Sequence, residues 1–226
     1  MRVSHEAARR RLAYFVGMQT RIDHLVLAGP DLAELVDHVT GRTGVAPVDG
    51  GPHVGLGTRN ALLGLGGMRY LELVAPDPDQ PEPERPRPFG IDRLTAPRLV
   101  GWSVRTHEMD DLLAAARRSG YDPRAAVPMS RVRPDGETLT WRVTPTEGGL
   151  DGILPFLIDW GETPHPTEGL PLVELVTLNV FHPDLAAVTA GLKAMRLRTG
   201  APVRLESGPR RLSATLNTAE GRIELG

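Results

Sequence analysis

The chain has 226 residues, with 26 lysines and arginines against 28 aspartates and glutamates, and it contains no cysteine. The length allows one or two globular domains with a substantial core, and the near-neutral charge argues against a nucleic-acid-binding protein. The lack of cysteine excludes disulfides, thiolate zinc sites, iron–sulfur clusters and cysteine nucleophiles. No apolar stretch reaches the roughly 20 residues that a membrane-spanning helix needs. We therefore expect a cytoplasmic protein with no membrane partner.

The N-terminal segment contains three consecutive arginines, Arg9 to Arg11, followed by the apolar run Leu12–Met18. This order resembles the start of a signal peptide, but the apolar part is at the short limit and no small-residue cleavage site follows it. We expect residues 1–18 to form an amphipathic lead-in helix. Met18 is an alternative start of the chain.

One layout of elements then occurs three times along the chain. Each copy begins with an apolar strand, continues through a turn into an amphipathic helix, and returns to strands. Asp31 and Asp184 stand where helix N-caps belong, and Gly44, Gly120 and Gly200 stand where helices end. The third copy lacks an obvious second strand.

The first two copies each contain a hairpin signal. Gly66-Gly67 separates two strand-like stretches in the first copy, and Pro134-Asp135-Gly136 does so in the second. Residues 76–97 between these copies are dense in proline and charge, which suits an extended linker or a flexible loop over a site better than a packed element.

Several motifs in order resemble the glyoxalase-like domain proteins of the vicinal oxygen chelate superfamily, which includes glyoxalases, bleomycin resistance proteins and dihydroxybiphenyl dioxygenases. The resemblance covers roughly residues 20–166. Its motifs are Ile22–Val26, Gly29–Leu32, His53–Asn60, Tyr70–Pro76, Arg133–Gly136 and Leu154–Gly161.

The resemblance implies an α+β fold in which paired βαβββ modules form a half-open barrel. The modules would span residues 19–77 and 98–160 within a glyoxalase-like domain of residues 19–166. Residues 167–226 would form a third, partial βαβββ-like module. This module could extend one sheet, cap the barrel edge, or pair with its mate in a homodimer.

The resemblance also implies a metal in the cleft, with ligands on the first and fourth strands of each module. In the first module these positions carry His24 and Glu72. In the second, Gly101 stands opposite His24, and either Ile158 or Asp159 stands opposite Glu72, with Asp159 inheriting the carboxylate position. Imidazole and carboxylate donors suit a divalent Mn, Fe, Ni or Zn ion.

Two residues of the first module are also candidates for catalysis. Glu72 alternates with the apolar Leu71 and Leu73, so it faces either solvent or the cleft, where it would act as a metal ligand or general base. His53 lies in a glycine-rich run before Asn60, and both side chains could contact a substrate.

The second module offers further substrate contacts. Trp102 and Trp160 either fill the core or stack on a planar ligand. Arg105 either lies at the surface or holds a substrate carboxylate in a bidentate fork. His165, in a proline-rich loop, is expected to be structural or exposed. No nucleotide cofactor is expected, because Gly55-Leu56-Gly57 lacks the third glycine of a dinucleotide fingerprint and opens no helix.

Two hypotheses for function follow. The first is a metal-assisted lyase, isomerase or dioxygenase that acts on a small oxygenated organic molecule through Lewis-acid polarisation. The second is a metal-free binding protein of the antibiotic-sequestering type, which would use the same cleft and its tryptophans. A third, plainer alternative is a structural or regulatory module.

Overall fold

The computed structural model describes residues 19–132, 136–147, 149–198 and 200–226. The lead-in helix expected over residues 1–18 lies outside these ranges, as do Pro134 and Asp135 of the second hairpin turn. No helix within the described ranges is long and apolar enough to cross a membrane.

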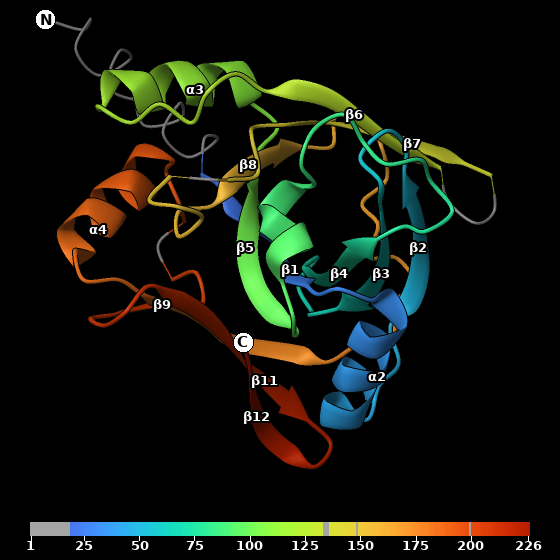
Figure 1. The fold of residues 1–226 in the computed structure, drawn as a ribbon. Helices are drawn as coiled ribbons and strands as arrows, with labels where there is room; N and C mark the ends of the chain where they lie inside the picture. Colours follow the sequence, from blue (N-terminus) through green and yellow to red (C-terminus); the bar gives the residue numbers. More distant parts are fainter. Residues whose placement is uncertain (1–18, 133–135, 148, 199) are drawn as a thin grey trace, which may run out of the picture.

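The larger of two sheets has eight strands and is nearly closed into a barrel (Figure 1). It runs in the order β2-β3-β4-β1-β5-β8-β7-β6. The first module comprises β1 (Arg21–Ala28), α2 (Leu32–Thr43), β2 (Val48–His53), β3 (Thr58–Gly64) and β4 (Tyr70–Pro76). The second comprises β5 (Arg98–Arg105), α3 (Met109–Arg118), β6 (Val127–Val132), β7 (Thr138–Val143) and β8 (Phe156–Asp159). The predicted α+β class and the pairing of two βαβββ modules are confirmed.

The two modules repeat the same pairing. In each module the first strand pairs in parallel with the fourth, β1 with β4 and β5 with β8. The antiparallel pairing of β1 with β5 joins the modules at the centre of the sheet. The first and fourth strands of both modules therefore lie side by side, and inward-facing side chains from all four can meet.

Local signals in the sequence account for the ends of the helices. Asp31 caps α2 by accepting a hydrogen bond from the Glu34 backbone N–H, and Gly44 ends the helix in the left-handed conformation. Asp184 caps α4 (Leu185–Ala194) in the same way. Each cap satisfies a backbone donor that the first helical turn leaves without an intrahelical partner.

Strands β2 and β6 form the two ends of the sheet, and Arg131 crosses between them. Its guanidinium donates to the backbone carbonyl of Gly50 and lies 3.4 Å from Asn60 Oδ1. A side chain at Gly50 would collide with Asn60 Oδ1 and with Arg131 Nη1, because both atoms lie too close to the position of an added Cβ. Glycine at this position therefore lets the two barrel edges approach each other.

The segment between the modules is more packed than its composition suggested. It contains a 3₁₀ turn, η1 (Pro88–Arg93), in which Ile91 is buried in an apolar cluster. Arg87 clamps the turn by ion pairs with Glu82 and Asp92, both at 2.8 Å. The expectation of an extended linker or a flexible loop over a site, without packing, is corrected here, because Ile91 is buried and Arg87 has two carboxylate partners.

The C-terminal residues form a second sheet of four strands, β9 (Glu174–Phe181), β10 (Val203–Glu206), β11 (Arg211–Thr218) and β12 (Gly221–Leu225). With α4 after β9, the element order is that of the barrel modules, and β10 supplies the second strand that the sequence did not reveal. The pairing differs, however: the order is β10-β9-β11-β12, and β9 pairs in parallel with the second strand instead of the fourth. The repeat in sequence is therefore not a repeat in topology.

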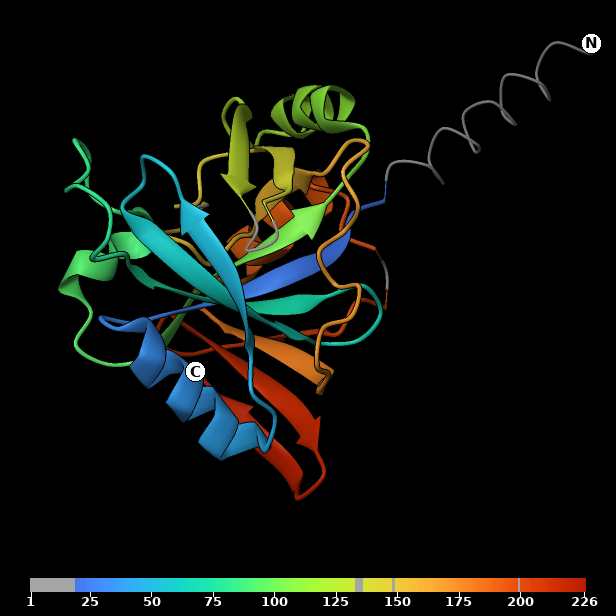
Figure 2. The same cartoon turned by 90° about the vertical axis from the view of Figure 1, so that its right-hand side faces the viewer.

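One apolar core connects the two sheets. Buried residues of the barrel, including Leu25 and Trp102, belong to the same cluster as Leu178 of β9, Met195 after α4 and Leu216 of β11. Figure 2 shows the second sheet beside the barrel, with α2 on the same side. The second sheet thus covers apolar barrel surface that water would otherwise contact.

Candidate functional site

A cavity of about 80 Å³ lies inside the barrel and is lined by both modules and by η1. Its polar lining comes mainly from the first module, in particular His24, His53, Asn60 and Glu72. Its apolar lining comes mainly from the second module and η1, and consists of aromatic and aliphatic side chains such as Phe89, Met129, Trp141, Phe156 and Trp160. The cavity therefore has one polar wall and one apolar wall.

A β-bulge in β1 places two ionisable side chains together at the polar wall. The register between β1 and β5 pairs Ile22 with Val104 and Leu25 with Trp102, so Asp23 and His24 together oppose a single residue. Such a bulge breaks the alternation of side chains between the two faces of a strand. Asp23 Oδ1 consequently lies 2.7 Å from His24 Nδ1, although the two residues are adjacent.

Asp23 is fully buried and is surrounded by hydrogen-bond donors. Its Oδ2 lies 2.9 Å from His165 Nε2 and 3.2 Å from Trp160 Nε1, and Arg105 Nη1 lies 3.6 Å away. Burial alone would raise the pKa of Asp23, but hydrogen bonds from His165 and His24 outweigh it and hold the pKa well below 3.8. Asp23 is therefore an ionised carboxylate inside the protein.

Glu72 of β4 lies between the two histidines of the first module. Its Oε2 is 3.7 Å from His24 Nε2, and its Oε1 is 3.5 Å from His53 Nε2. Asn60 Nδ2 donates to Glu72 Oε1 at 2.6 Å. Oε1 is thus held by a protein donor, whereas Oε2 faces His24 across the cavity lining.

Asn60 is held in one orientation by its neighbours. Its amide oxygen faces Arg131, and its amide nitrogen faces both Glu72 Oε1 and His53 Nε2, the latter at 3.2 Å. An amide N–H donates, so His53 Nε2 accepts, and His53 Nδ1 contacts Thr58 Oγ1 at 3.0 Å. Burial lowers the pKa of His53 below 6.5, which keeps the ring neutral and suited to accept this bond.

The second module carries no counterpart of His24 or Glu72 in this lining. Gly101 is the fourth residue of β5, as His24 is of β1. Val26, the sixth residue of β1, pairs with Glu72, and Ser103, the sixth residue of β5, pairs with Phe156. Phe156 therefore takes the place equivalent to Glu72, and Phe89 packs over Gly101.

This donor set does not fit the divalent metal that the resemblance implied. Within the described ranges, no group of three or more histidine, aspartate and glutamate side chains is arranged to hold a metal ion. His53, the third donor near His24 and Glu72, has its Nε2 against an amide N–H of Asn60, where a cation would be repelled. Protein metal sites with an open position use about three protein ligands, and only two remain here.

The other residues singled out from the sequence lie in different places. Trp160 lines the cavity. Trp102 is fully buried in the main core, where its Nε1 donates to the Ile153 carbonyl. Arg105 donates to the Ile22 carbonyl and faces Asp23 from behind the cavity. Asp159 lies in an outer groove and accepts a hydrogen bond from the Gly161 backbone. Trp102, Arg105 and Asp159 are therefore not brought to the cavity lining.

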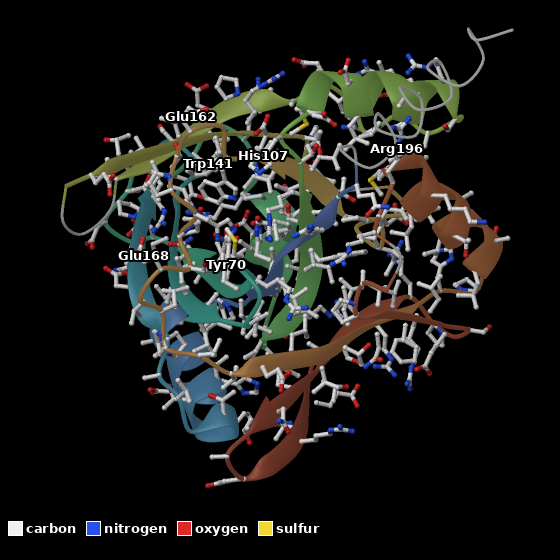
Figure 3. All side chains as sticks on the ribbon, turned by 180° about the vertical axis from the view of Figure 1, so that it is seen from behind. Tyr70, His107, Trp141, Glu162, Glu168 and Arg196 are labelled. Atoms are coloured by element: carbon white, nitrogen blue, oxygen red, sulfur yellow. The ribbon has the colours of Figure 1, made fainter. Side chains whose placement is uncertain are left out.

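The cavity adjoins this outer groove at shared residues. The groove has a volume of about 940 Å³ and shares Leu56, Met129, Trp141 and Trp160 with the cavity lining. The rings of Trp141 and Trp160 pack against each other, with their centroids 5.3 Å apart. Figure 3 shows Trp141 and Tyr70 within the ring of barrel strands, and Arg196 far from them beside α4. A ligand in the cavity can thus extend toward the groove where the two linings meet.

Sequence reasoning did not single out Asp23, Phe156 as the counterpart of Glu72, or Arg131 as the support of Asn60. It also treated His165 as structural or exposed, whereas the His165 side chain is only 8% exposed and bonds to Asp23. Asp23 directly precedes His24 in the sequence, but the alternation of side chains along a strand would place Asp23 on the face of the sheet opposite to His24. A signal for the bulge is not visible in the residues themselves.

Residues 22–196 match the family model described as a glyoxalase-like domain. Among solved structures, a hypothetical protein from Staphylococcus aureus has a TM-score of 0.67 and 13% identity, covering 85% of this chain and 88% of its own. Methylmalonyl-CoA epimerase from Mycobacterium tuberculosis has a TM-score of 0.42 and 17% identity, covering 66% and 91%. A methylmalonyl-CoA epimerase in complex with methylmalonyl-CoA and NH4+ has a TM-score of 0.43 and 21% identity, covering 66% and 99%. No curated protein matches the chain.

Proposed function

This chain belongs to the glyoxalase-like domain family of the vicinal oxygen chelate superfamily, and from that premise we propose that its cavity binds a small oxygenated organic molecule and exchanges a proton with it. The observation that carries the proposal is the pair of His24 Nε2 and Glu72 Oε2, 3.7 Å apart in the cavity lining. Histidine and glutamate are the side chains most often used for proton transfer in enzymes.

The hydrogen bonds around this pair support the proposal. Asp23 accepts the Nδ1–H of His24, and in the neutral ring His24 Nε2 is then an acceptor. Asn60 donates to Oε1 of Glu72, so Oε2 is the oxygen that remains for a ligand. Two acceptors that face the same space call for a donor between them. A hydroxyl group, or a C–H made acidic by a neighbouring carbonyl, supplies that donor.

The proposed reaction is an isomerase-type proton transfer. Glu72 takes a proton from one carbon or oxygen of the bound molecule and gives a proton back to another atom of that molecule, and the proton exchanges with solvent while Glu72 holds it. The step consumes no oxidant, reductant or metal, so its atoms and electrons balance within the substrate and Glu72. His24, as a second acceptor held in place by Asp23, orients the substrate hydroxyl.

The size and polarity of the cavity limit the substrate. The volume is about 80 Å³, so the cavity takes a small molecule or the reacting end of a larger one. Phe89 and Phe156 suit a carbon skeleton on the side away from Glu72. Any larger part extends past the residues that the cavity shares with the groove.

The same aromatic residues favour a second candidate, a metal-free binding protein without turnover. Trp141, Trp160, Phe89 and Phe156 make the lining suitable for a planar ligand. In this case Glu72 and His24 would only accept hydrogen bonds from the ligand, and no proton would be exchanged.

An exchange experiment separates these candidates. The protein is incubated with dihydroxyacetone in D₂O, and replacement of carbon-bound hydrogen by deuterium is followed by ¹H NMR. We expect exchange above the buffer rate, and a loss of about a hundredfold or more in Glu72→Gln, whereas Asp159→Asn in the groove serves as the matched control and retains the rate. No exchange, together with catechol binding that quenches tryptophan fluorescence, would establish the binding protein instead.

A further inference from the structure

The loop between the barrel and the second sheet carries a histidine that reaches the surroundings of the polar wall. His165 lies in this loop, after β8 and before β9, and its ring is packed against Tyr70 and Trp160 at centroid distances of 5.8 and 5.7 Å. Its Nε2 is 2.9 Å from Asp23 Oδ2, and its Nδ1 is 2.9 Å from Thr167 Oγ1. Both ring nitrogens therefore have partners.

These contacts determine where the protons lie. An ionised carboxylate only accepts hydrogen bonds, so the ring nitrogens that face Asp23 must both carry hydrogen. His165 is then protonated at Nε2 and accepts from the Thr167 hydroxyl at Nδ1. His24 carries hydrogen at Nδ1, and in the neutral ring this leaves Nε2 as an acceptor toward the cavity.

His165 is the closest of the donors to Asp23 Oδ2. Trp160 Nε1 is at 3.2 Å and Arg105 Nη1 at 3.6 Å. Arg105 also donates to the carbonyls of Ile22 and Met68, which hold its guanidinium on the side away from the cavity. If His165 were absent, the carboxylate would be drawn toward Arg105, and its other oxygen would lose alignment with His24 Nδ1.

We infer that His165 is a positioning residue: it holds the Asp23 carboxylate so that His24 presents Nε2 to the cavity. The loop that joins the barrel to the second sheet is then part of the site and not merely a connection. The effect of this arrangement on proton exchange rests on the proposed function, whereas the arrangement of protons on His24 does not.

The ring nitrogens of His24 in the full-length, ligand-free protein provide the test, since ¹⁵N chemical shifts distinguish a protonated nitrogen from a bare one. His165→Gln keeps an N–H donor within reach of Asp23, and His165→Leu removes it. We expect Nδ1–H in the wild type and in His165→Gln, and a mixture of the two tautomers in His165→Leu. Unchanged His24 shifts in His165→Leu would overturn the inference, as would equal changes in the Gln and Leu variants.

Two further variants keep the test decisive if His165→Leu does not fold. Thr167→Val leaves the imidazole in place but removes the hydroxyl that contacts its Nδ1, and it should shift His24 in the same direction by a smaller amount. No shift in Thr167→Val would count against the inference. His182→Gln, at a half-buried histidine beyond β9, is the control and should leave His24 unchanged.

The exchange of dihydroxyacetone hydrogen gives the second readout. With the proposed function correct, His165→Leu should slow the exchange by about ten- to a hundredfold, as expected for a misplaced reacting group, and His165→Gln should restore most of it. Tautomer changes in His165→Leu without any wild-type exchange would leave the inference standing and overturn the proposed function. Exchange that is equally fast in His165→Leu would overturn the inference.

Discussion

Phe156 holds in the second barrel module the position that Glu72 holds in the first. Glu72 pairs with the sixth residue of β1 and Phe156 with the sixth residue of β5. The Phe156 ring also lies edge-on to His24, at a centroid distance of 5.3 Å. Two modules of the same topology have thus placed a carboxylate at this position on one wall of the cavity and an aromatic ring at the equivalent position on the other.

This relationship predicts the metal content of the protein. Wild-type protein incubated with Mn or Zn and then desalted should hold no stoichiometric metal, because His24 and Glu72 supply only two ligands. Phe156→Glu would add a third donor at the equivalent position and should bind about one ion, whereas Phe156→Gln should not. Elemental analysis by plasma mass spectrometry is the measurement. One ion in the wild type that is lost in Glu72→Ala would contradict the account.

The buried carboxylate predicts a loss of stability on acidification. The folded-state pKa of Asp23 is lower than its ordinary value of 3.8, so its contribution is fully present well above pH 3.8 and is lost as the pH falls below that value. Asp23→Leu leaves Arg105, His24 and His165 without their shared acceptor and should cost about 3–5 kcal/mol of unfolding free energy at pH 7. Urea unfolding measures this, with Asp159→Leu as a half-exposed control. A cost below that of the control would contradict the prediction.

The buried His53 should give the unfolding free energy a second pH dependence, at a higher pH than that of Asp23. Burial lowers its pKa below the ordinary value of 6.5, so the unfolded chain binds a proton more readily than the folded one. The unfolding free energy should therefore decrease as the pH falls from about 6.5 toward the folded-state pKa. His53→Gln removes this titration and should flatten the dependence between pH 7 and pH 5.5. An equally steep dependence in the variant would assign it to another group.

Replacement of glycine by alanine should have opposite effects on stability at two positions. Gly50→Ala forces its Cβ against Asn60 and Arg131, which should cost about 1–3 kcal/mol through overpacking and should also loosen the hold of Asn60 on Glu72. Gly41→Ala lies in α2 with nothing within 4 Å of the added Cβ, and it should stabilise the helix by about 0.5–1 kcal/mol. Thermal unfolding of both variants provides the comparison, and a neutral Gly50→Ala would show that the barrel edge is looser than described.

Much of the fold could be predicted from the sequence because its signals are local. The caps at Asp31 and Asp184 and the turn at Gly66-Gly67 depend on residues a few positions apart, and the two barrel modules follow from the order of such elements. The topology of the second sheet could not be predicted in this way. Element order is the same in all three copies, but the choice of partner for β9 depends on packing against the rest of the protein.

The candidate site was predicted in part, for a related reason. His24, His53, Asn60 and Glu72 lie on neighbouring strands, and alternation together with the resemblance brings them to one lining. Asp23 requires a bulge, and His165 contacts it from 142 positions away. The sequence alignment placed Asp159 at the position equivalent to Glu72, whereas the register between β5 and β8 places Phe156 there. Long-range contacts and register are the features that local patterns do not contain.

In the proposed function, a small hydroxylated molecule in the cavity contacts both His24 and Glu72. The most direct measurement is an NMR experiment on catechol bound to the protein, which records nuclear Overhauser effects between its ring protons and assigned side chains. We expect the catechol ring protons to contact the His24 and Phe156 rings, and we expect these contacts to disappear in a His24→Ala, Glu72→Gln double variant. Contacts confined to groove residues such as Thr138 and Thr140, or contacts unchanged in the double variant, would contradict it.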